Sequence, residues 1–183
     1  VGGTLGVTGV LTGTSLDISG DIDVDGTTNL DIVDVDGAVN FAADVTFANG
    51  ADIITASAGT SNFRAGVNAG NSIASGGNYN VTVGDEAGTA ITTGDNNTFI
   101  GYVSGDANTT ASNNTVIGAY SFSQNTTGAS NVALGVSALG YNTTASNNTA
   151  VGMDALKLNT TGANNTAVGH NSLDANTEGG LNT

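Results

Sequence analysis

The residues best suited to chemistry by type and spacing are three aspartates near the start of the chain. Asp21, Asp23, Asp25 and Gly26 match the first half of the calcium-loop pattern D-x-D-x-D-G. A glutamate should close that loop at its twelfth position, where this chain has Ile32. Because alternate residues of a strand point to one face, the three carboxylates can line one side of a strand. We expect a solvated acidic face here and keep a metal site as the weaker alternative.

Catalytic groups are scarce in the rest of the sequence. The chain has no cysteine and one histidine, His170, and no serine has a recognisable base partner. His170 belongs to a repeat position that varies widely in residue type, so we expect it to be exposed. Paired carboxylates for glycoside hydrolysis stay open, although the acids of the repeat region are scattered. We expect neither an enzyme nor a bound cofactor.

The charge balance restricts the partners that the chain can bind. Sixteen acidic and two basic residues give a net charge of −14, and the two bases, Arg64 and Lys157, lie far apart in the sequence. Nucleic acids and anionic membrane surfaces bind clustered Lys and Arg, so the composition argues against both. No run of 18 apolar residues predicts a membrane span.

A 17-residue repeat organises the second part of the chain. An aliphatic residue followed by glycine recurs with this period, and an asparagine stands four residues before each glycine. A second asparagine position, followed by threonine, comes seven residues after the glycine. A weaker copy at Asn62–Gly66 lies one position further from Gly84 than the period requires, which predicts a one-residue insertion within Ser75–Gly77. The aliphatic residues are Val83, Ile100, Ile117, Leu134, Val151 and Val168; the glycines are Gly84, Gly101, Gly118, Gly135, Gly152 and Gly169; the first asparagines are Asn80, Asn97, Asn114, Asn131, Asn148 and Asn165.

The length of the unit predicts a β-solenoid. Helix-pair repeats have about 33 residues or more, whereas 17 extended residues span about 56 Å, enough for one flattened coil. Coils stacked about 4.8 Å apart would align equal positions into columns. We expect the aliphatic residues to form an inner ridge, the glycines to take positive φ or allow close approach at a corner, and the asparagines to form an amide ladder. A second short strand is expected to end at Leu139, Leu156 or Leu173.

Two segments differ in pattern. Residues 1–60 lack the repeat and show short apolar strands broken by Gly and Asp, which predicts a β-rich shaft segment. Residues 61–183 form the predicted repeat solenoid. Each coil has few large apolar residues, so side-by-side association of several chains is expected to add burial. The first residue is Val1 and the sequence stops where the next strand should begin, so we expect a piece of a longer protein.

The run from Asn125 to Gly169, with its NTAVG and NTTG motifs, resembles repeats in tail-fibre proteins of bacteriophages, especially marine ones. It is also similar to the head repeats of trimeric autotransporter adhesins, whose units are usually shorter. The segment from Gly20 to Phe47 resembles stretches of the same phage fibres. This resemblance implies an all-β, fibrous homotrimer of stacked parallel β-coils, a β-solenoid or β-roll.

The resemblance also implies a function. As a phage tail-fibre shaft, the chain would be a structural virion protein that lies outside the cell and supports host attachment. Its partners would be its own copies, other tail proteins, and a host receptor or glycan. The alternative is a bacterial cell-surface adhesin whose stalk or head binds ligand directly. Ice binding is the weakest of the three, because no T-x-T column persists along the repeat.

Overall fold

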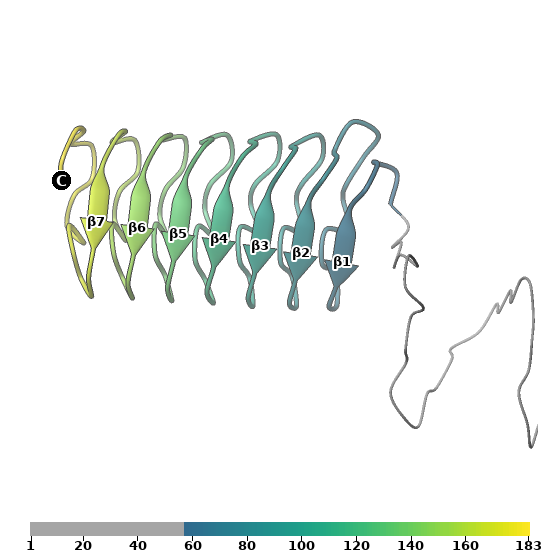
Figure 1. The fold of residues 1–183 in the computed structure, drawn as a ribbon, viewed down its shortest axis with the longest axis horizontal. Helices are drawn as coiled ribbons and strands as arrows, with labels where there is room; N and C mark the ends of the chain where they lie inside the picture. Colours follow the sequence, from purple (N-terminus) through teal and green to yellow (C-terminus); the bar gives the residue numbers. More distant parts are fainter. Residues whose placement is uncertain (1–56) are drawn as a thin grey trace, which may run out of the picture. The chain divides into compact units, whose positions relative to one another are not determined.

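The computed structural model describes residues 57–183, which fold as a parallel β-solenoid (Figure 1). Seven strands of three residues form one parallel sheet in sequence order, one strand for each coil. The strands are β1 (Phe63–Ala65), β2 (Val81–Val83), β3 (Thr98–Ile100), β4 (Thr115–Ile117), β5 (Val132–Leu134), β6 (Thr149–Val151) and β7 (Thr166–Val168). The all-β class and the stacked coils predicted from the repeat are therefore confirmed.

The register of the sheet follows the repeat. Ile100 pairs with Ile117, and Ile117 pairs with Leu134, so equal positions of successive repeats lie side by side. Between β1 and β2 the sequence separation of paired residues is one residue longer than the repeat, since Phe63 pairs with Val81.

The place of the inserted residue can be read from the hydrogen bonds of the first two coils. The amide of Ala74 donates to the carbonyl oxygen of Thr92 at 2.9 Å. The sequence separation between these two residues is still one residue longer than the repeat. The carbonyl oxygens of Gly77 and Gly94 accept equivalent asparagine bonds, and these two glycines are separated by one ordinary repeat. The extra residue thus lies between Ala74 and Gly77, as the sequence predicted.

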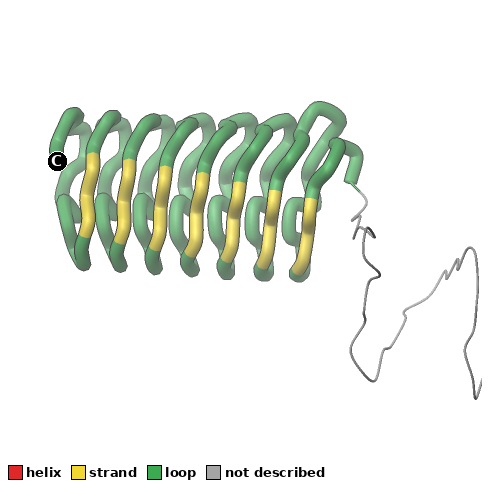
Figure 2. The backbone as a smooth tube through the Cα atoms, in the orientation of Figure 1, coloured by secondary structure: helices red, strands yellow, loops and turns green. Residues whose placement is uncertain are grey.

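The predicted second strand is absent from the coils of residues 57–183. The segment after each repeat glycine consists of turns, and it appears as loop beside the row of strands in Figure 2. Alternate residues there take the left-handed conformation: φ is 143° at Gly118, 56° at Tyr120 and 56° at Phe122. A segment with left-handed residues at alternate positions cannot form an extended strand, because a strand needs consecutive residues in the β region.

The prediction that the aliphatic residues form an inner ridge is wrong, because these residues lie on the outer face of the sheet. In β4 the central residue, Val116, is fully buried, whereas Thr115 and Ile117 are exposed. The reason is the strand period of two. Asn114 is fully buried, so it fixes Val116 on the inner side and Ile117 on the outer side. The same holds in the other coils, where the predicted ridge residues Val83, Ile100, Leu134 and Val151 are half-buried and Val168 is exposed.

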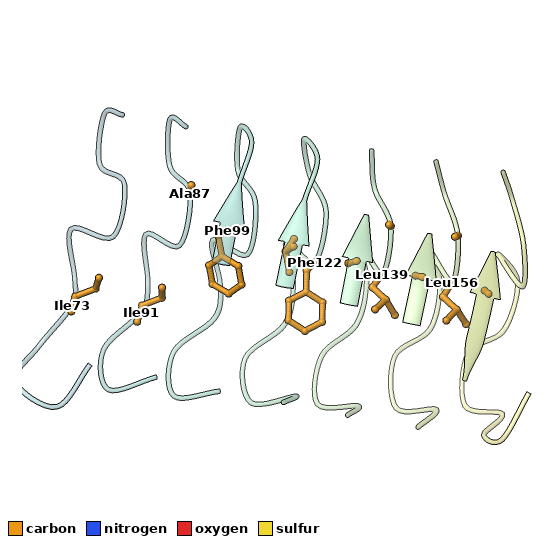
Figure 3. Close-up of a cluster of buried hydrophobic side chains, with 13 residues drawn as sticks. Ile73, Ala87, Ile91, Phe99, Phe122, Leu139 and Leu156 are labelled. Atoms are coloured by element: carbon orange, nitrogen blue, oxygen red, sulfur yellow. The ribbon is translucent and has the colours of Figure 1, made fainter. Parts of the chain in front are cut away.

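The interior is filled by residues whose sizes compensate from coil to coil. In β3 the central residue is Phe99. A Cβ atom on Gly105 would lie only 2.8 Å from the Phe99 ring, so the ring fills the space beside this glycine. Two coils later the central residue is Ala133, and the position equivalent to Gly105 holds the buried side chain of Leu139. Large and small residues thus exchange places across the coil. Figure 3 shows the resulting row of buried side chains, in which Ile73, Ile91, Phe99, Phe122, Leu139 and Leu156 are labelled.

The predicted N-terminal shaft segment falls almost entirely outside the described residues. Asp21, Asp23 and Asp25, the candidate metal ligands, lie there as well. Across residues 57–183 we find no helix with the length and hydropathy that a membrane span requires.

Candidate assembly and binding surfaces

A column of buried asparagines runs along the interior beside the sheet. The Oδ1 atom of Asn80 accepts the backbone amide of Asn97 at 3.0 Å and the side-chain amide of Asn97 at 3.0 Å. The Nδ2 atom of Asn97 also donates to the carbonyl oxygen of Ala111 at 2.9 Å. The pattern repeats with small variations up to Asn182, and from Asn62 to Asn165 these side chains are at most 5% exposed. A buried amide is stabilising only when its donors and acceptors are satisfied, and here they are.

A second asparagine column begins at Asn108. The Nδ2 atom of Asn125 donates to Oδ1 of Asn108 at 2.9 Å, and Asn142 donates in the same way to Asn125 at 2.9 Å. The two columns meet at shared backbone carbonyls: the oxygen of Gly128 accepts from both Asn114 and Asn125 at 3.1 Å. Asn108 and Asn142 head N-x-T sequons, and their burial gives these asparagines a structural role.

The glycine column sits at the corner that follows each strand. All six repeat glycines have φ between 124° and 143°. At Gly101 a Cβ would lie 2.7 Å from the carbonyl carbon of Gly118, the next glycine of the column. The position therefore requires glycine both for its conformation and for the close approach of adjacent coils.

The outer face of the sheet carries the aliphatic column. Ile117 is 43% exposed and Val168 69% exposed, and the strand-start position that lies beside this column holds threonine or valine in β2–β7. Beyond the glycine corner a second exposed column adds further apolar residues, which are Val67, Tyr102, Val136 and Met153. Contiguous exposed apolar surface is typical of interaction sites.

Three tyrosines gather on the turn side of the coils. Tyr102, Tyr120 and Tyr141 occupy different repeat columns, so the sequence pattern alone predicts no aromatic stripe. In the structure the rings of Tyr102 and Tyr120 pack edge to face, with centroids 5.2 Å apart at 85°. Tyr120 and Tyr141 also line one hollow of about 340 Å³. The stagger of one position between Tyr102 and Tyr120 brings the rings together, and no sequence column reveals such a diagonal contact.

Electrostatic interactions are few on this side of the solenoid. Lys157 forms an ion pair with Asp154 at 2.9 Å, and the hydrogen bond that the ammonium group donates to Asp154 raises the pKa of Lys157. The neighbouring Tyr120 raises the pKa of the Tyr102 phenol. Burial raises the pKa of the Asp106 carboxyl, which lies two residues after the buried Ser104.

The described residues include His170 and the acidic side chains of the repeat region. His170 is exposed, as the variability of its column indicated. Residues 57–183 contain no group of three or more His, Asp or Glu side chains close enough to hold a metal ion.

Comparisons with known proteins identify no family for this chain. No protein-family model matches it, and neither a curated protein nor a solved structure matches it.

Proposed function

We propose that this chain is a structural segment of a bacteriophage tail fibre, assembled as a homotrimer and supporting attachment of the virion to its host. The observation that carries the proposal is the aliphatic column on the outer face of the sheet, exemplified by Ile117 and Val168. The resemblance of the repeat to phage fibre repeats supplies the virion context and the number of chains.

A second copy of the same chain fits this face better than an unrelated partner. The face presents the same chemistry once in every coil, and the coils are spaced by the distance between hydrogen-bonded strands, about 4.8 Å. A parallel copy has the same spacing, so its aliphatic side chains can interdigitate along the whole stack. An irregular protein surface would match only a few coils.

The thin interior gives association a physical reason. In β5–β7 the buried central residue is alanine, and Leu139 and Leu156 are the large apolar side chains buried in these coils. Apolar burial stabilises by about 25 cal/mol per Å², so a coil with one large buried apolar side chain has a small apolar core of its own. Covering the outer aliphatic column would add apolar burial in each coil.

The assembly is tested by measuring the mass of the full chain in solution. We expect three times the 17.8 kDa of one chain. Each chain carries a charge of −14, so the measurement belongs at about 0.15 M salt, where the Debye length is about 8 Å. Ile117→Asp should reduce the mass, because the buried carboxylate would be unpaired at the interface. Thr144→Asp adds the same charge at an exposed corner and should leave the mass unchanged.

A single-chain mass for the unaltered protein would contradict the proposed assembly, as would an Ile117→Asp variant that keeps the full mass. The virion context has its own test. Antibodies against the chain should label the tail fibres of the phage particles in electron micrographs. Labelling of a bacterial cell surface in place of virions would overturn the fibre assignment in favour of the adhesin.

A further inference from the structure

We propose that the hollow between Tyr120 and Tyr141 binds a neutral hexose unit of a carbohydrate. It lies on three successive coils and has a volume of about 340 Å³. Its lining consists of Tyr120, Ser123, Gln124, Ser137, Gly140, Tyr141 and Lys157. The inference concerns the turn side of a single chain, so it does not depend on the proposed trimer.

One lining residue of the hollow, Gly140, has no side chain. Gly140 stands in a repeat column between Ser123, one coil before, and Lys157, one coil after. Its carbonyl oxygen accepts the backbone amide of Gln124 at 3.2 Å, which holds the floor of the hollow in place. Gly140 does not have positive φ, unlike the corner glycines, so the backbone conformation does not require glycine here. A Cβ atom on Gly140 would lie 3.1 Å from the carbonyl oxygen of Ser137, another lining residue, so a side chain there would narrow the hollow.

Two tyrosines form walls that the fold does not require. Tyr120 is 49% exposed and Tyr141 43% exposed, so neither ring belongs to the core. Tyr120 has φ of 56°, in the left-handed region that is unfavourable for a bulky residue. The same column holds Asn171, a type that tolerates this conformation. All residues of this column from Glu86 to Asn171 have φ between 55° and 60°, so the coil imposes the conformation. The exposed ring of Tyr120 therefore stays available to contact a ligand.

The polar groups of the lining favour a neutral, hydroxyl-rich ligand. Ser123, Gln124 and Ser137 offer uncharged donors and acceptors. The Ser123 hydroxyl donates to the carbonyl oxygen of Gly140 at 3.4 Å, and the Gln124 side chain is exposed. The charge of Lys157 is balanced by Asp154 at 2.9 Å. Because this lysine is already paired and the chain carries a net charge of −14, the hollow does not favour an anionic ligand.

A hexose has the complementary surface. One face of the ring presents C–H groups that pack on an aromatic ring, and its edge presents hydroxyls that hydrogen-bond to serine and amide side chains. Sites that bind small molecules combine apolar walls with a few placed polar groups, which is the arrangement of this hollow. A purely apolar ligand would leave the serine and glutamine groups unsatisfied.

Four variants of the full chain test the site. Tyr141→Ala copies Ala107 of the same column, Gly140→Ser copies Ser123, and Tyr120→Asn copies Asn171, so each places a residue that the repeat already accommodates. The control is Tyr79→Asn, since Tyr79 is also exposed and left-handed, with φ of 58°, but lies outside the hollow.

The probes are the methyl glycosides of glucose, galactose and mannose, titrated by saturation-transfer NMR. We expect at least one to bind in the millimolar range, with affinity reduced about tenfold in Tyr141→Ala and Tyr120→Asn, equivalent to about 1.4 kcal/mol. Gly140→Ser should reduce it similarly by filling the floor, and Tyr79→Asn should bind like the unaltered chain.

Two outcomes would overturn the proposal. The first is no binding of any probe up to about 50 mM, and the second is equal binding in all four variants. The solution mass of the same samples separates the two proposals. A monomer that binds a glycoside refutes only the assembly, and a trimer that binds none refutes only the hexose site.

Discussion

Replacing Asn131 with alanine tests the asparagine column in the middle of the stack. Its Oδ1 atom accepts the backbone amide of Asn148 at 2.9 Å, and its Nδ2 atom donates to the carbonyl oxygen of Ala145 at 2.9 Å. The alanine variant leaves the Asn148 amide buried without an acceptor, which costs about 1–3 kcal/mol. The Ala145 oxygen keeps its bond from Asn142, so its lost bond costs about 1 kcal/mol.

The space left by the amide adds about another 1 kcal/mol, since the rigid coils above and below cannot close it fully. We therefore expect Asn131→Ala to lower the free energy of unfolding by about 3–5 kcal/mol. The assay is urea unfolding followed by circular dichroism, with the midpoint and slope fitted for both proteins.

The matched control is Asn147→Ser, one residue before the next asparagine of the column. Asn147 is exposed with φ of 62°, and Ser130 occupies the equivalent position one coil earlier. This change should alter the free energy of unfolding by no more than about 0.5 kcal/mol. Equal effects of the two substitutions, or a cost below about 1 kcal/mol for Asn131→Ala, would refute the account of the column as a set of satisfied buried amides.

Three further changes probe other features of the stack. Gly118→Ala should destabilise by at least about 2–4 kcal/mol in thermal unfolding, because its Cβ would overlap the carbonyl oxygen of Gly135 and φ is 143°; a neutral effect would contradict the corner geometry. Ile91→Asn restores the repeat residue yet should destabilise by about 1–3 kcal/mol in urea, because Ile91 fills the space beside Gly88; a gain in stability would show that packing there is loose. Burial raises the pKa of the Asp106 carboxyl above 3.8 in the folded chain. The contribution of this carboxyl to the free energy of unfolding is therefore most favourable below pH 3.8 and is lost as the pH rises through the folded pKa. Asp106→Asn should therefore raise the thermal midpoint relative to the parent at pH 7 and show no advantage near pH 3; an unchanged midpoint at pH 7 would contradict the burial.

The period of the repeat predicted most of the fold, because a fixed interval between equal residues leaves few ways to stack them. It gave the register of Ile100, Ile117 and Leu134 and located the inserted residue after Ala74. It did not give the facing of the aliphatic column. The signal was present, since Asn114 lies two residues from Val116 and shares its side of the strand, but an asparagine column inside the coil is less expected than an aliphatic one.

The candidate surfaces were harder to predict than the fold. The contact of Tyr102 with Tyr120 joins different repeat columns, and it depends on left-handed residues that turn the segment after each strand. The sequence pattern indicated a strand there, because apolar residues such as Leu139 recur at its end. The left-handed conformation of a buried leucine, with φ of 51°, is set by packing within the stack and has no signature in residue type.

Engineered disulfides test the stacking of equal repeat positions most directly. The chain has no cysteine, so the pair Thr127→Cys and Thr144→Cys can be oxidised without competing thiols. Adjacent coils place these exposed positions at about the 4.4–6.8 Å Cα separation that a disulfide spans, whereas Thr127→Cys with Thr161→Cys joins positions two coils apart, at about 10 Å. We predict that the first pair forms an intramolecular disulfide, seen by mass spectrometry of non-reduced peptides, and that the second does not. Rapid closure of the second pair, or failure of the first, would contradict the solenoid.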